Sequence, residues 1–229
     1  MIPDAKNIFF DPVIQRKIPK LKLGILIAQN VTINIKSELV TKQFQELETY
    51  LKAQFKDHPP SLNEIVSDVR RMYRRIGWEP TNYRPSSEAM IRRILKGIGL
   101  YNINNLVDLG NVASARFHLP MGLYDFDKIE GDIIIDVGKE GESYQGISKK
   151  KIRGTGKMVL RDNLGIFGNP TADSKRTSLT EKSKTVLAIF FTPPEVSKSY
   201  LRQTLDFLQF LYMKECPKSQ FYQNIIIQD

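Results

Sequence analysis

Apolar and polar residues alternate near the N-terminal end of the chain in a pattern that predicts one long strand. Between Lys22 and Ile35 the β-branched residues fall mostly on odd positions, which is the two-residue period of a half-buried strand. Residues 37–55 have the spacing of a helix, and the run His58-Pro59-Pro60 that follows cannot continue one. A strand followed by a helix is therefore expected over this part of the chain.

Three further helices are predicted from apolar residues that lie three and four positions apart. Ser61 and Glu64 form a capping box ahead of the first helix, whose apolar stripe continues to Ile76. Ser86 is placed to cap the second helix, which carries apolar residues as far as Ile98. A short third helix is expected over 104–116.

Beyond Pro120 the pattern changes to short apolar segments separated by glycine, which is typical of strands. These segments cover 132–137, 157–160, 164–167 and 185–191. Thr192 and Glu195 form another capping box ahead of a helix that reaches about Tyr212, and a last strand is expected over 222–227. This order predicts an α+β fold with helices packed on antiparallel or mixed sheet. Because no repeat or linker interrupts it, one domain over 1–229 is the simpler interpretation.

The charged residues favour a polyanionic partner. The chain has 34 Lys and Arg against 25 Asp and Glu, a net charge of +9, which is typical of proteins that bind nucleic acid. Residues 70–96 contain eight basic and two acidic residues, a local net charge of +6. The alternative for this segment is a solvated helix face without a ligand. The candidate phosphate-binding residues are Arg70, Arg71, Arg74, Arg75, Arg92, Arg93 and Lys96.

Several common catalytic signatures are missing from the sequence. It contains no G-x-x-x-x-G-K-[ST] phosphate loop, no G-x-G-x-x-G, no G-x-S-x-G elbow and no H-E-x-x-H. Only two histidines and one cysteine are present, so neither a metal site nor a cofactor is predicted. The single cysteine and the lack of an apolar run of bilayer length favour a cytoplasmic protein without a membrane partner.

The most informative stretch lies between Arg84 and Asp132. It contains N-N-L-V-D-L-G-N over 104–111 and P-M-G-L-Y-D-F-D-K-I over 120–129. In these blocks and their spacing the chain closely resembles the tRNA-editing module of the phenylalanyl-tRNA synthetase β subunit, formed by the third and fourth segments of that subunit. It resembles the free-standing relatives of that module more closely still. The likeness is most specific over 84–191.

The resemblance implies a three-layer α+β fold, binding of a tRNA acceptor end, and hydrolysis of the ester that joins a wrong amino acid to that tRNA. In the family the substrate is tyrosine on phenylalanine tRNA. Such editing exists because a pocket that selects by size and apolarity cannot exclude a close analogue. The implied partners are tRNA and, in trans, a synthetase, and no DNA is expected. By position, the resemblance implies a substrate pocket formed by Gly110, Pro120, Met121 and Gly168, with catalytic roles for Asn111, Ser114 and Gly122.

The chain departs from the bacterial synthetases at two positions of this pocket. Those enzymes carry a histidine just after the P-M pair and a glutamate shortly after a G-I-F-G-like turn, whereas this chain has Gly122 and then Asn169-Pro170. The nearest acid, Asp173, and the nearest imidazole, His118, are both out of register. The group that would orient the attacking water is therefore not identified by the resemblance.

Three hypotheses about function remain open. The first is an editing hydrolase in which backbone N–H groups near Gly122 and Gly168 stabilise the oxyanion. Under this hypothesis, we expect open space beside Gly122. The second is a non-catalytic protein that keeps the fold and binds tRNA or an aromatic amino acid. The third is a general RNA- or membrane-surface-binding protein, which only the net charge favours. ATP-dependent ligase activity is not expected, because no ATP site is found in the sequence.

Overall fold

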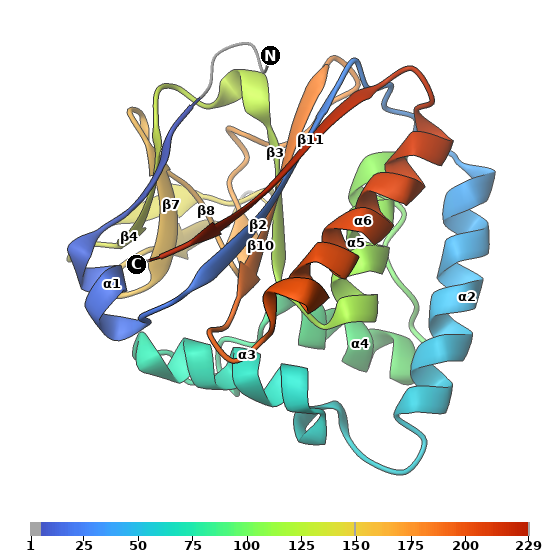
Figure 1. Cartoon of the computed structure of the whole chain (residues 1–229), viewed down its shortest axis with the longest axis horizontal. Helices are drawn as coiled ribbons and strands as arrows, with labels where there is room; N and C mark the ends of the chain where they lie inside the picture. The colour runs from blue at the N-terminus through green and yellow to red at the C-terminus, as the bar shows by residue number, and fades with distance from the viewer. Residues whose placement is uncertain (1–5, 149, 229) are drawn as a thin grey trace.

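The chain folds into three layers, made of helices, a four-stranded sheet and a five-stranded sheet. In the computed structural model, which describes residues 6–148 and 150–228, the two sheets lie face to face and helices cover the outer face of the four-stranded sheet (Figure 1). The expected three-layer α+β class, with helices on antiparallel and mixed sheet, is confirmed. The one-domain prediction extends over residues 1–5, Lys149 and Asp229, which lie outside the described residues.

The four-stranded sheet is antiparallel throughout and forms the middle layer. In spatial order its strands are β11 (Gln220–Ile227), β2 (Lys22–Gln29), β10 (Thr185–Thr192) and β3 (Met121–Asp125). Segments far apart in the sequence meet here, because Ile189 of β10 faces Ile25 on one side and Gly122 on the other. This order leaves β3 at one edge of the sheet.

The five-stranded sheet is mixed. In spatial order its strands are β1 (Ile8–Phe10), β4 (Ile133–Val137), β7 (Met158–Asp162), β8 (Gly165–Asn169) and β9 (Ala172–Asp173). β1 pairs with β4 in parallel, and the pairs that follow along the sheet are antiparallel. A separate hairpin is formed by β5 (Ser143–Gln145) and β6 (Lys151–Arg153).

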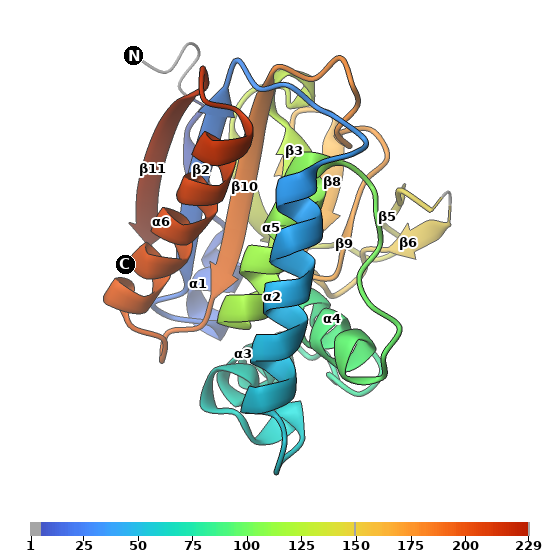
Figure 2. The same cartoon turned by 90° about the vertical axis from the view of Figure 1, so that its right-hand side faces the viewer.

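Most of the helices gather on one face and one end of the middle sheet, whereas the first helix contacts β4 of the five-stranded sheet. The helices are α1 (Pro12–Lys17), α2 (Glu38–Gln54), α3 (Glu64–Arg75), α4 (Ser86–Leu95), α5 (Asn105–Phe117) and α6 (Lys198–Glu215), with 3-10 turns at Pro60–Leu62 and Phe126–Lys128. α5 and α6 pack on the middle sheet, and α2 and α4 pack on α5 (Figure 2). Within the described ranges, no helix combines the length and the apolar character needed to cross a membrane.

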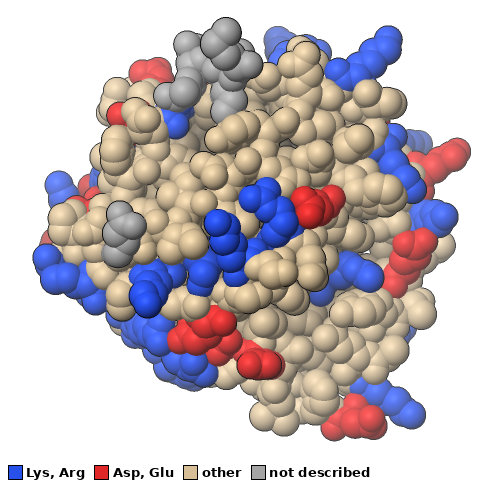
Figure 3. Space-filling view, in the orientation of Figure 1, with Lys and Arg blue, Asp and Glu red and all other residues tan. Residues whose placement is uncertain are grey.

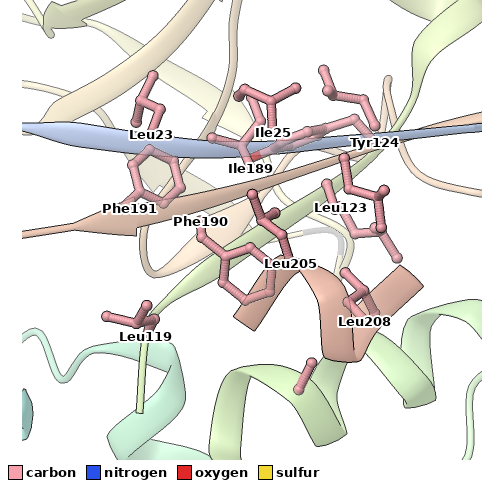
Figure 4. Packing of buried hydrophobic residues seen from close by; sticks show 14 of the residues in the cluster. Leu23, Ile25, Leu119, Leu123, Tyr124, Ile189, Phe190, Phe191, Leu205 and Leu208 are labelled. Atoms are coloured by element: carbon pink, nitrogen blue, oxygen red, sulfur yellow. The ribbon is translucent and has the colours of Figure 1, made fainter. Parts of the chain in front are cut away.

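Side chains of the middle sheet alternate between its two faces. Leu123 and Phe190 point toward α6, where Leu205 and Leu208 meet them, while Tyr124 points the opposite way, toward the five-stranded sheet (Figure 4). There the Tyr124 ring packs edge-on against Phe167 of β8, with ring centroids 5.0 Å apart. The strand alternation therefore delivers Tyr124 to the space between the two sheets.

The predicted helix starts were partly wrong. The helix after residue 60 is capped by the side chain of Asn63, and the last helix by Ser197, so neither Ser61 nor Thr192 is the N-cap. In both cases prolines precede the true cap and are accommodated in extended or turn conformation, which moves the first helical turn later in the sequence. The strand predicted over 22–35 ends at Gln29, because Asn30 adopts a left-handed conformation with a φ of 57°.

Candidate functional site

Two glycines face one tyrosine ring in the space between the sheets. A β-carbon added to Gly122 of β3, or to Gly168 of β8, would overlap with the hydroxyl oxygen of Tyr124. Gly122 and Tyr124 are two residues apart and share a face of β3, so the ring leans back along its own strand over Gly122. The structure thus brings Gly122 and Gly168 together, as the sequence predicts. The expectation of open space beside Gly122 is wrong, because the Tyr124 phenol fills that space.

A polar cluster surrounds the hydroxyl end of this ring. The hydroxyl of Tyr144 donates to the carbonyl of Ala172 at 2.6 Å and accepts from the side-chain amide of Asn169 at 2.7 Å. Asp173 Oδ2 accepts a hydrogen bond from the backbone N–H of Leu123 at 3.3 Å. Asp173 Oδ1 and the Tyr124 hydroxyl are buried near each other, but neither has an aligned hydrogen bond to a described residue.

The electrostatics of the cluster favour a protonated carboxyl. Burial raises the pKa of Asp173 to about 7, and its contacts with the Tyr124 hydroxyl and the Leu123 N–H oppose that shift only in part. Burial, together with the neighbouring Asp173 carboxylate, raises the pKa of both Tyr124 and Tyr144 well above that of a free phenol. Two neutral phenols therefore stand next to a carboxyl that changes its charge near neutral pH.

A groove of about 430 Å³ opens on the outer side of this cluster. Tyr144 and Ser174 line it, together with Gln145, Ile166, Lys175 and Arg176. Tyr144 belongs to both the groove and the polar cluster, and Ser174 directly follows Asp173 in the chain. The groove therefore adjoins the polar cluster that contains Asp173.

The remaining predicted pocket residues lie elsewhere. Gly110 is in α5, where an added β-carbon would lie 2.6 Å from Met121 Cε, so these two residues meet on the helix side of the middle sheet. The buried Ser114 hydroxyl, also in α5, donates to the carbonyl of Leu119 at 2.6 Å and holds the end of that helix. Asn111 is half-buried in the same helix. Pro120 is buried, and its carbonyl accepts from the backbone N–H of Phe191.

The seven candidate pocket residues are therefore divided by the middle sheet. Gly122 and Gly168 share the space between the sheets, whereas Gly110, Asn111, Ser114 and Met121 lie with the helix layer. The backbone amide that faces Asp173 belongs to Leu123, and Gly122 pairs with Ile189 inside the sheet. Alternation along β3 explains the division, since Met121 and Leu123 point away from the face that holds Gly122.

The basic residues of α3 have acidic partners, and one of them, Glu195, is distant in the sequence. Glu195 accepts hydrogen bonds from Arg75 at 2.6 Å and Arg71 at 3.2 Å, and Arg71 also pairs with Asp68. Arg74 lies 3.8 Å from Glu79. Figure 3 shows one face of the molecule on which Lys and Arg side chains form a band with Asp and Glu beside it. The local charge counted along residues 70–96 overstates the charge that α3 presents to a ligand.

Sequence reasoning did not assign a role in these regions to three residues that shape them. Tyr124 was part of the recognised block, but only its rotamer shows that it fills the space beside Gly122. Asp173 was noted as out of register, and the turn between β8 and β9 brings it to the site. Glu195 is more than a hundred residues from Arg71 and Arg75. A strand-alternation argument could have placed Tyr124 with Gly122, whereas nothing in the sequence pairs Glu195 with α3.

Comparison with known proteins places this arrangement in a family. The model of the B3/4 domain matches residues 68–206. The β subunit of phenylalanine–tRNA ligase from Fusobacterium nucleatum is 25% identical over 144 residues, which are 58% of this chain and 17% of that protein. The corresponding subunit from Bartonella henselae is 32% identical over 104 residues, or 44% of this chain and 13% of that protein. The chain thus spans less than a fifth of these ligase subunits.

Two further relatives cover more of the chain. The uncharacterised protein YhzB of Bacillus subtilis is 20% identical over 193 residues, which are 84% of this chain and 86% of that protein. The crystal structure of an N-terminal fragment of the phenylalanyl-tRNA synthetase β subunit from Pyrococcus horikoshii covers 97% of this chain and 54% of the fragment, with a TM-score of 0.48 and 11% identity. The family model covers more than half of the 229 residues, and the chain therefore belongs to the B3/4 domain family.

Proposed function

We propose that the protein binds aminoacylated tRNA in the cytoplasm and hydrolyses the ester of a misacylated tRNA. The similar proteins from Fusobacterium nucleatum and Bartonella henselae are β subunits of phenylalanine–tRNA ligases, which supports tRNA as the ligand. The observation that carries the hydrolytic part is the Asp173 carboxyl, whose pKa is raised to about 7. This residue lies next to Gly122 and Gly168, the two glycines that the family resemblance assigns to the pocket. A carboxyl with that pKa is suited to accept a proton near neutral pH.

The chemistry requires one water molecule and no covalent intermediate. The Asp173 carboxylate removes a proton from the water as its oxygen attacks the ester carbonyl carbon. The bond between that carbon and the ribose oxygen then breaks, and the proton passes to the ribose oxygen. The products are a free amino acid and a tRNA with an intact terminal hydroxyl. An aminoacyl ester is an activated ester, so a positioned base and a hydrogen-bond donor are enough to accelerate this reaction.

Tyr124 indicates what the pocket accepts. Its phenol lies between Gly122 and Gly168 with the hydroxyl directed to the polar cluster, so the walls fit an aromatic ring with a polar end. An aromatic aminoacyl side chain would occupy the same volume once Tyr124 turns out of it. The groove lined by Tyr144 and Ser174 adjoins the polar cluster and is the approach to Asp173 in this proposal.

The same tyrosine favours the second candidate function, a non-catalytic protein that binds tRNA. Tyr124 is fully buried and packs against Phe167. If it never leaves its place, the space between the glycines is part of the core and no ester reaches Asp173. In that case, the two glycines serve only to admit the ring.

A deacylation assay separates the two candidates. The purified chain is mixed with a panel of tRNAs, including tyrosine on phenylalanine tRNA, and release of the amino acid is followed against the spontaneous rate. We expect release above that rate for one pair, a loss of at least tenfold in Asp173→Asn, and no loss in Asp206→Asn, which removes an exposed carboxylate from α6. Binding of tRNA without release from any pair would establish the non-catalytic candidate.

A further inference from the structure

A second concave site lies on α4, away from the space between the sheets. It is a groove of about 380 Å³ with a basic wall formed by Arg84, Arg92, Arg93 and Lys96. Apolar and aromatic residues complete the lining, among them Met90, Ile98 and Tyr101. None of the side chains that line it is acidic. This combination of cations and an exposed ring resembles neither a core cavity nor the paired surface of α3.

A buried carboxylate orders the basic wall from beneath. The side chain of Glu88 is 1% exposed, and the Nε atoms of three arginines approach it, at 2.8 Å for Arg92, 3.7 Å for Arg70 and 4.0 Å for Arg84. Glu88 meets the Nε edge of each guanidinium. For Arg84 and Arg92, no described residue accepts a hydrogen bond from the terminal nitrogens. Glu88 thus holds Arg92 by a hydrogen bond and lies near Arg84 and Arg70. The terminal nitrogens of Arg92 and Arg84, which line the groove, remain as donors for an anion.

The aromatic wall is also held in place. The Arg93 guanidinium lies 4.0 Å from the centre of the Tyr101 ring, and its Nε donates to the carbonyl of Gly99 at 2.6 Å. A further hydrogen bond of 3.2 Å joins Arg93 to the Tyr101 hydroxyl. In spite of these contacts, Tyr101 is 60% exposed. A fixed, exposed ring beside arginine and lysine side chains is a platform on which a nucleobase can stack.

We propose that this groove binds one nucleotide unit of single-stranded RNA. Its phosphate is held by Arg84, Arg92 and Lys96, and its base stacks on Tyr101. A base within a duplex is already stacked and paired, so its faces are not available to the Tyr101 ring, whereas an unpaired base can stack on that ring. That the nucleotide belongs to RNA rests on the proposed function, and a free mononucleotide has the same recognition chemistry.

The test uses the purified full chain and three probes: a fluorescent single-stranded RNA of eight nucleotides, an RNA duplex of the same length, and AMP. We expect Tyr101→Ala to weaken binding of the single strand by about tenfold, as loss of one stacked base does. Tyr101→Phe should keep the affinity, because the ring remains. Lys96→Gln should reduce the slope of log K against log salt by about 0.7. Lys218→Gln removes an exposed charge from the loop after α6 and should have little effect.

Three results would overturn the proposal. They are an unchanged affinity in Tyr101→Ala, an equal loss for single strand and duplex, and tight binding of AMP with no binding of RNA, which would make the groove a mononucleotide site. The deacylation assay reports separately on the proposed function. If Asp173→Asn leaves deacylation intact while Tyr101→Ala still weakens RNA binding, the groove stands and the hydrolytic proposal fails. If Tyr101→Ala leaves the RNA affinity unchanged while Asp173→Asn lowers the deacylation rate, the groove proposal fails and the hydrolytic proposal stands.

Discussion

The space between the sheets and the groove on α4 both carry the chemistry of a ligand site, but only one of them is open. Between the sheets, Gly122 and Gly168 leave room that the chain itself fills with Tyr124. On α4, Glu88 gathers arginines whose terminal donors stay free of described partners. Glycines in a recognised motif therefore do not establish a cavity, because a neighbouring ring can occupy the room they leave. Arginines that share one buried carboxylate and keep terminal donors free of described partners are the basis for the anion site that we propose on α4.

The largest expected effect concerns the close fit of Tyr124 on Gly122. Gly122→Ala places a methyl group against a fully buried ring, and we expect it to lower the free energy of unfolding by about 3 kcal/mol. In a Tyr124→Leu background the same substitution should cost less than about 1 kcal/mol, because the ring end is gone. Urea unfolding of the four variants measures this coupling.

The coupling between these two substitutions shows whether the space between the sheets is closed in solution. Additive costs would mean that the ring leaves Gly122 easily, so the space would already be open to a ligand in solution. A Gly122→Val variant is not expected to fold with a blocked pocket, since a larger side chain meets the ring more severely than alanine does.

A smaller effect is expected in the pH dependence of stability. The pKa of Asp173 rises from an ordinary value of 3.8 to about 7 in the folded chain. Between these values the folded chain binds more protons than the unfolded one, so stability falls as the pH rises through this window. Asp173→Asn should remove about 2 kcal/mol of this pH-dependent loss in the free energy of unfolding. A fully buried carboxyl would contribute more, but Asp173 is partly exposed.

Thermal unfolding of this variant at several pH values, with Asp206→Asn as the control, checks the sign. Identical pH profiles for Asp173→Asn and the wild type would show that the carboxyl is solvated. The candidate base would then have an ordinary pKa, and the contrast between a closed interior site and an open surface groove would weaken.

The smallest expected effect is a difference in RNA affinity between a variant of α3 and a variant at the end of α4. Arg75 is bound to Glu195 at 2.6 Å, so its charge is already compensated. Arg75→Gln should change the affinity for single-stranded RNA by less than about twofold, whereas Lys96→Gln should lower it by about threefold. Fluorescence titrations at two salt concentrations measure both. Equal losses would mean that the basic residues act as one diffuse surface and that the groove on α4 has no special role.

Local patterns predicted much of the fold, because short-range interactions decide it. Helices were predicted over 37–55 and 104–116, and α2 and α5 lie there, capped by Ser37 and Asn104. The starts of α3 and α6 were predicted too early, since the expected caps at Ser61 and Thr192 are replaced by Asn63 and Ser197.

The site was less predictable, because contacts over long sequence separations decide it. Gly122 and Gly168 meet as the resemblance implies, but the ring between them depends on the rotamer of Tyr124. The pairing of Glu195 with Arg71 and Arg75 joins segments that share no sequence pattern. The charge on a helix surface therefore cannot be counted from its own segment.

The most direct test of the proposed hydrolysis is the pH dependence of single-turnover deacylation, measured on the best misacylated tRNA and corrected for the spontaneous rate. The account predicts that the enzymatic rate rises with pH and levels off above an apparent pKa near 7, as Asp173 loses its proton. In Asp173→Asn this transition should be absent and the rate at least tenfold lower. A rate that keeps the same transition and magnitude in Asp173→Asn would contradict the assignment of Asp173 as the base.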